Sequence, residues 1–231
     1  MDSLPQELIE AIIDDLPRHT LRSSSLIASR WRTRSQQRIL DSITFPSHDM
    51  VDRWYSDVQR GSDDRIVSYV GFAKFRGIDS WNEPTLFGRV LKGLCSLTTL
   101  EVNRCAISDE LPGQILRGEF GRGITKLCLW IPDCNLSTIA SMILSLPDLK
   151  KVTVTAASEK PSKQPLSTSI PPQRRSLDLL ELYSYSNEVA EALIQARLTS
   201  RCICFGGAIS SVHRLLATSS ETLVALMLDG V

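Results

Sequence analysis

A short apolar pattern recurs through most of this 231-residue chain and limits the folds that the chain can adopt. The pattern is apolar-x-x-apolar-x-apolar, and successive copies start 22 to 30 residues apart. The copies are Val67/Val70/Phe72, Leu97/Leu100/Val102, Ile124/Leu127/Leu129, Leu149/Val152/Val154, Leu177/Leu180/Leu182 and Leu223/Leu226/Leu228, with a weaker copy at Thr199/Cys202/Cys204. A period of about 20 to 29 residues is typical of arrays in which each unit contributes one short strand.

Segments with helical spacing separate these strands. Apolar residues recur every three or four positions in residues 84–94, 137–146 and 187–198, which predicts a helix in each. A single strand or helix of this size cannot bury its apolar side alone, so the units must stack on one another. We therefore expect an α/β fold: an irregular strand-helix solenoid over residues 46–231, with a parallel sheet on one face.

Residues 1–45 have a different pattern and are expected to form a separate helical module. A first helix begins at Pro5 and ends before Pro17, and its apolar residues form an unusually wide stripe: Leu8, Ile9, Ile12, Ile13 and Leu16. A second helix is predicted to start near Thr20 or Ser23 and to continue through Trp31 into a run of arginines, followed by an extended exit near residue 45. The stripe is too wide for two short helices to cover, so it must pack against the rest of the chain or against a partner.

Composition and charge exclude several classes of protein. Lys plus Arg and Asp plus Glu number 26 each, so no global field favours nucleic acid, and the arginine run near Trp31 lacks further aromatic residues. No apolar run is long enough to span a membrane. The six cysteines are dispersed in a chain of this size, which favours reduced thiols and a cytoplasmic or nuclear location.

The sequence contains no motif typical of catalysis. The segment GRGITK (residues 121–126) precedes a predicted strand and does not open a helix after one, so it lacks the context of a phosphate-binding loop. Cys202 and Cys204 form a lone C-x-C pair with only His213 near in sequence, which is too few ligands for a structural zinc site. We therefore expect no enzyme activity, no cofactor and no metal.

The segment at about residues 156–175 interrupts the repeats. It holds four prolines among Ser, Lys and Arg, which predicts a disordered loop inserted between two units. A regulatory or partner-binding role for its exposed serines is the alternative. The chain stops directly after the last predicted strand, so we expect a truncated or atypical end.

Two resemblances follow from these motifs. LTTLEVNRCAI (residues 97–107) is similar to a leucine-rich repeat, in which the Cys packs inward after the strand. LPQELIEAIIDDLP (residues 4–17), LIASRW (residues 26–31) and RSQQRILDSITF (residues 34–45) resemble an F-box, as in the large fungal class of F-box proteins that carry such repeats.

The F-box resemblance implies a substrate receptor of an SCF-type cullin-RING ubiquitin ligase. In that family the F-box docks on the Skp adaptor, which links it to the cullin, and the repeats bind a protein substrate. The positions that match the adaptor-binding motif are Leu4, Pro5, Leu8, Ile9, Ile12, Leu16, Leu26, Ile27 and Trp31. The alternative is a non-enzymatic leucine-rich-repeat scaffold whose first 45 residues only cap the solenoid. The two differ in whether the apolar face of the first helix is exposed.

Overall fold

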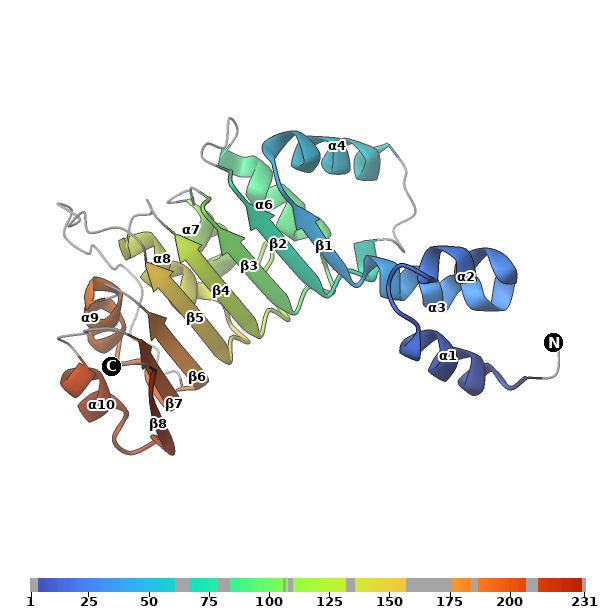
Figure 1. Ribbon diagram of the computed structural model, residues 1–231. Coiled ribbons are helices and arrows are strands. Elements are labelled where there is room, and N and C mark those ends of the chain that lie inside the picture. Colours follow the sequence, from blue (N-terminus) through green and yellow to red (C-terminus); the bar gives the residue numbers. More distant parts are fainter. Residues whose placement is uncertain are drawn as a thin grey trace.

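The protein has a mixed α/β fold built on one parallel sheet. The structure is a computed structural model that describes residues 4–60, 67–78, 84–105, 107, 110–131, 136–156, 176–183, 187–206 and 212–229. Eight strands pair in sequence order, β1 to β8, and every pair is parallel. The helices that follow the strands lie on one face of the sheet, and its other face is open (Figure 1).

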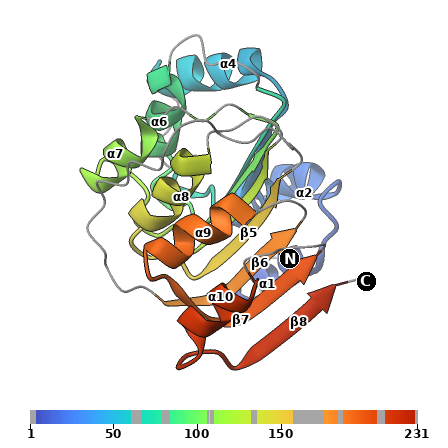
Figure 2. The same ribbon diagram turned by 90° about the vertical axis from the view of Figure 1, so that its left-hand side faces the viewer.

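The strands are short and regularly spaced along the chain. They are β1 Ser42–Phe45, β2 Phe72–Arg76, β3 Thr99–Asn103, β4 Lys126–Ile131, β5 Lys151–Ala156, β6 Ser176–Tyr183, β7 Thr199–Gly206 and β8 Ala225–Asp229. The helices are α1 Gln6–Asp15, α2 Leu21–Ile27, α3 Ser29–Leu40, α4 His48–Gln59, α6 Pro84–Gly93, α7 Leu111–Leu116, α8 Leu136–Ser145, α9 Asn187–Gln195 and α10 Val212–Ser219. Figure 2, turned by 90°, shows α6 to α10 as a layer beside the sheet.

The main core lies between the sheet and these helices. Each central strand turns two apolar side chains toward the helices, and the strand register aligns them with those of the next strand. The aligned pairs are Ala73/Phe75, Leu100/Val102, Leu127/Leu129, Val152/Val154, Leu180/Leu182 and Ile203/Phe205, all buried. Helix residues such as Val90 and Met142 complete the same core.

A repeated hydrogen bond joins successive units just before the strands begin. The Asp41 carbonyl accepts from the backbone N–H groups of Gly71 and Phe72, both at 2.9 Å. The carbonyl of Gly71 in turn accepts from the next unit, at Thr98 and Thr99, and the same arrangement recurs along the sheet as far as β6. Because each unit satisfies the backbone of its neighbour, the stack is held by more than its apolar contacts.

Aromatic side chains and α4 close the core at its β1 end. The ring of Phe45 stacks on that of Phe75 with centroids 4.8 Å apart, and Trp54 of α4 meets Phe45 edge-on at 5.6 Å. Phe87 of α6 packs edge-on against Phe75 at 4.7 Å. Offset and edge-on aromatic pairs of this kind stabilise a core beyond their area alone.

The parallel sheet is confirmed, as are the helices expected at residues 84–94, 137–146 and 187–198. For two copies of the apolar pattern, the prediction of which residues face the core is wrong. In β7, Ile203 and Phe205 pair with Leu180 and Leu182 and face the core, so Cys202 and Cys204 face the open side.

The predicted copy Val67/Val70/Phe72 also differs from the inward-facing residues of β2. Ala73 and Phe75 stand in register with Leu100 and Val102, and Phe72 lies on the open face of the sheet. The strand Ser42–Phe45, at the end of the expected helical module, pairs with β2 and is the first strand of the sheet. The loop expected to be disordered lies, beyond Ala156, outside the described residues.

The helix expected to run through Trp31 is broken in two. Ala28 is extended, with φ −154° and ψ 155°, and separates α2 from α3. The buried hydroxyls of Ser24 and Ser35 then meet at 3.1 Å. In one continuous helix these residues would lie about 16 Å apart along the axis. The break therefore lets α2 fold back onto α3.

Leu127 tests the main core. It is fully buried in the middle of the sheet, so Leu127→Ala should lower the free energy of unfolding by about 2 to 5 kcal/mol. The exposed Leu116 is the matched control, and Leu116→Ala should change it by less than about 0.5 kcal/mol. Urea unfolding measures both, and equal effects would contradict the assigned core.

Candidate protein-interaction site

Helices α1, α2 and α3, which we call the helical module, have a small core of their own. Ile9, Ile13 and Leu21 are buried in it, and Leu16, Trp31 and Ile39 pack around them half-buried. None of these residues belongs to the main core. The module lies to one side of the sheet, beyond the start of β1 (Figure 1).

The wide apolar stripe of α1 divides into a buried and an exposed half. Ile9 and Ile13 are one helical turn apart and face α3, and Leu8 and Ile12 are one turn apart on the adjacent face. Leu8 is 51% exposed and Ile12 is 41% exposed. The module core thus explains only half of the apolar residues in this helix.

The end of α2 adds two further exposed side chains. Leu26 is 81% exposed and Ile27 is 62% exposed. Arg30, three residues beyond Ile27, donates from Nη2 to the carbonyl of Leu4 at 3.1 Å and so holds the start of α1 beside the α2–α3 junction. We call the set of exposed residues the module apolar surface: Leu4, Leu8, Ile12, Leu26 and Ile27.

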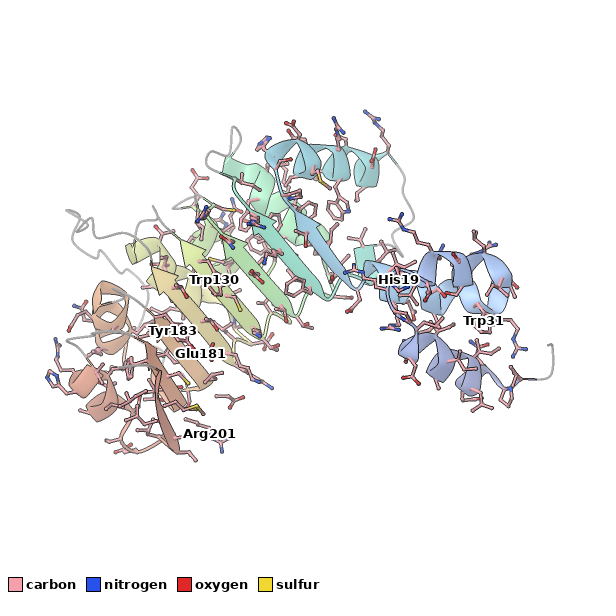
Figure 3. The ribbon with its side chains drawn as sticks, viewed as in Figure 1. His19, Trp31, Trp130, Glu181, Tyr183 and Arg201 are labelled. Atoms are coloured by element: carbon pink, nitrogen blue, oxygen red, sulfur yellow. The ribbon has the colours of Figure 1, made fainter. Side chains whose placement is uncertain are left out.

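The structure separates the nine sequence-predicted contact residues into two groups. Those at the surface are Leu4, Pro5, Leu8, Ile12, Leu26 and Ile27. Ile9 lies in the module core, and Leu16 and Trp31 are half-buried against it (Trp31 is labelled in Figure 3). These three residues shape the module and offer little surface for a partner.

Arginines of the basic run hold the module together. Arg34 of α3 forms a two-pronged ion pair with Asp14 of α1, with N···O distances of 2.8 and 2.6 Å. Arg38 donates to the carbonyl of Leu16 at the end of α1, and to the carbonyl of Ile13, which also accepts from the Leu16 backbone N–H. The hydrogen bond from Arg34 lowers the pKa of the Asp14 carboxyl below its ordinary value, and desolvation opposes this only in part.

A polar hollow of about 670 Å³ lies where the module meets the sheet. Arg18 crosses it and donates to the Ser42 hydroxyl at 3.0 Å and to the Ser42 carbonyl at 2.7 Å, which ties the module to the first residue of β1. Its other lining residues include Asp14, Arg34 and Arg38, which are already bonded within the module. The side chains that line the hollow therefore hold the helical module against the first strand of the sheet.

The open face of the sheet is polar and forms cross-strand rows. One row runs Thr44, Lys74, Glu101, Cys128, Thr153, Glu181, Cys204 and Met227; the next contains Arg76, Asn103, Trp130, Thr155 and Tyr183. Burial raises the pKa of the Cys128 thiol, so the thiol stays protonated at neutral pH. Among the described residues, no cluster of His, Cys, Asp or Glu could hold a metal ion.

A second set of exposed apolar side chains lies at β8. Leu226 and Leu228 continue the rows of core residues, with Ile203 and Phe205 as their partners on β7. They are 43% and 67% exposed because no described helix packs over them.

No protein-family model matches the sequence, and no curated protein matches it significantly. Among the described residues, no helix is long and apolar enough to cross a lipid bilayer.

Arg38 tests how the module is held. Arg38→Met leaves two carbonyls at the end of α1 without this donor, so we expect local opening of α1 to become easier by about 1 to 2 kcal/mol. Amide hydrogen exchange of α1, compared with that of β4, measures this. Arg32 is exposed on the same helix, and Arg32→Met should leave exchange unchanged. Unchanged protection of α1 in the Arg38 variant would contradict the capping role.

Asp14 gives a prediction for pH. The pKa of Asp14 is lowered in the folded state, so the ionised carboxylate stabilises the module when the pH is above 3.8, the ordinary pKa of this group. This contribution is lost as the pH falls through the folded-state pKa. In Arg34→Met, the titration midpoint of Asp14, followed by carboxyl ¹³C NMR, should rise toward 3.8. In Arg32→Met it should not move, and a rise there would mean that general charge, and not the Arg34 hydrogen bond, sets the pKa.

Proposed function

We propose that this protein is a substrate receptor of an SCF-type cullin-RING ubiquitin ligase. In this proposal the helical module is an F-box that docks on the Skp adaptor, and the sheet with its helices is a leucine-rich-repeat-like solenoid that binds a protein substrate. The chain itself carries no catalysis and acts in the cytoplasm or nucleus. The observation that carries the proposal is the module apolar surface, which remains exposed on a module that already has its own core.

An exposed apolar surface of this kind favours a protein partner. Leu8 and Ile12 are exposed one turn apart on α1, and Leu26 and Ile27 are exposed at adjacent positions of α2, so each helix presents a pair of large apolar side chains and not a single one. Burying one Leu or Ile contributes roughly 1.5 to 3 kcal/mol, so a few such anchors can offset the cost of association. The resemblance to the F-box selects the Skp adaptor as that partner.

The structure gives less support to the alternative of a plain scaffold with a helical cap. A cap would place its apolar side against the open end of the main core. That end is instead closed by Phe45, Phe75 and α4, with Trp54 edge-on to Phe45. The apolar residues of α1 and α2 that remain are exposed, which supports the receptor proposal.

The adaptor contacts in this proposal are the module apolar surface together with Pro5. Ile9, Leu16 and Trp31, which also match the motif, act indirectly by fixing the angle between α1 and α3.

The test is co-purification of the full chain with the Skp adaptor. The double variant Leu8→Asp and Ile12→Asp places two charges on exposed positions, so we expect it to abolish capture while the protein stays folded. Point variants are better than deletion of residues 1–45, because that deletion would remove β1 from the sheet.

The matched control carries two charges on apolar residues that are exposed elsewhere. Met50→Asp with Leu116→Asp changes residues on α4 and α7, and we expect full adaptor capture. Thermal unfolding of both double variants checks that each is folded. Capture by the Leu8/Ile12 variant, or its absence from the unmodified chain, would refute the receptor proposal.

A further inference from the structure

Two aromatic residues stand on either side of a threonine on the open face of the sheet. The register pairs Trp130 of β4 with Thr155 of β5, and Thr155 with Tyr183 of β6. Neighbouring strands lie about 4.8 Å apart, so the backbones that carry the two rings are separated by roughly 9 to 10 Å. Figure 3 shows Trp130 and Tyr183 on the face away from the helices. We call Trp130, Thr155 and Tyr183 the aromatic slot.

The floor of this slot has an unsatisfied polar group. The Oγ1 atom of Thr155 is buried and has no hydrogen-bond partner. Buried hydroxyls nearly always have a partner, so the Thr155 hydroxyl is available to accept a hydrogen bond from a further donor. Trp130 is 45% exposed, so part of its side chain is open to a group that approaches from solvent. The ring of Tyr183 leans over Gly206 of β7, on the side of β6 away from Thr155, where a Cβ on Gly206 would lie 2.4 Å from the Tyr183 Cδ1 atom.

A carboxylate with no counter-ion among the described residues lies beside the slot. Glu181 is two residues before Tyr183 on the same face of β6, and the Thr153 hydroxyl donates to its Oε2 atom. Within the described part of the chain, no Lys, Arg or His lies within salt-bridge distance of Glu181. Its counterpart Glu101, in the same row, is paired with Lys74 at 2.5 Å.

The nearby cations do not neutralise Glu181. Arg201 lies on the adjacent strand but toward its start, where its guanidinium is 4.0 Å from Asp178. Figure 3 shows Arg201 well below Glu181 on the sheet. Lys126 and Lys151 stand in the row nearest the strand starts, and both are exposed. The slot therefore combines two aromatic residues, a hydroxyl without a partner and, beside them, a carboxylate that pairs with no cation in the part of the chain that the structure describes.

We propose that the aromatic slot and Glu181 bind an arginine side chain from an extended segment of the target protein. This inference rests on the proposed function, since it assigns the repeats a target, and it names the chemistry by which that target is recognised. A guanidinium is planar, so it stacks on an indole or phenol ring while its N–H groups donate in a fork to a carboxylate. A further N–H donates to Thr155 Oγ1. Lysine has one compact, strongly hydrated ammonium group and fits this combination less well.

The test uses the ¹⁵N-labelled full chain and a small probe, Nα-acetyl-arginine N-methylamide, which mimics an arginine within a peptide. We expect the indole N–H resonance of Trp130, assigned with a Trp130→Phe variant, to shift and saturate during titration. Glu181→Gln should weaken binding by about tenfold or more, because it removes the charged acceptor. The matched lysine probe should bind more weakly, and the citrulline probe, which keeps the shape but lacks the charge, should not bind.

The control variant is Glu119→Gln. Glu119 is a surface carboxylate already paired with Arg117 at 2.8 Å and lies outside the strands, so its loss should leave arginine binding unchanged. No shift of the Trp130 resonance, equal binding of citrulline, or equal weakening by Glu119→Gln would each overturn the inference.

The adaptor experiment is independent, because it uses the module apolar surface. Adaptor capture without arginine binding would refute only this inference. Arginine binding without adaptor capture would leave the slot established and refute only the receptor proposal.

Discussion

The parallel pairing of consecutive strands is the constraint on which the rest of this structure depends. When β3 is followed by a parallel β4, the chain must return from the end of one strand to the start of the next, and a short hairpin cannot do this. Such crossovers have one preferred hand, and the strand order advances in one direction from β1 to β8. The described helices that connect successive strands therefore lie on the same face of the sheet (Figure 1). No described helix covers the opposite face (Figure 1).

This arrangement separates the two faces chemically. Side chains alternate along each strand, so Leu127 and Leu129 enter the core and Cys128 and Trp130 face the open side. The in-register stacking then places residues from distant parts of the sequence beside one another, as with Trp130 and Tyr183, which are neighbours only through Thr155. A continuous surface of mixed aromatic and charged groups thus needs no binding loop, because the repeat itself assembles it.

The sequence predicts the period, the parallel sheet and most inward-facing residues, because Leu and Val at fixed spacing are typical of buried strand positions. The sequence assigns the wrong face of β7 to the core. Residues 202–205 of this strand are all of types that can be buried, so alternation alone does not show which two face the core. The register against Leu180 and Leu182 shows that they are Ile203 and Phe205. The break at Ala28 is also missed. Alanine by itself favours a helical conformation. The extended conformation of Ala28 is stabilised by the contact that it allows between α2 and α3. Glu181 carries no local signal either, since the neighbours of its side chain among the described residues depend on how the sheet is assembled.

The arginines of α3 show why a run of charges is a poor guide to function on its own. In sequence, Arg30, Arg34 and Arg38 give the module a basic stretch of the kind found in nucleic-acid-binding helices. In the fold, their N–H groups bond to the Leu4 carbonyl, to Asp14 and to the last carbonyls of α1. These bonds give the Leu4 and Leu16 carbonyls a side-chain donor, and they pair a carboxylate with a cation. These three arginines therefore hold the module together, and leucine and isoleucine side chains of α1 and α2 remain exposed beside them, which fits the proposed apolar protein partner better than a phosphate backbone.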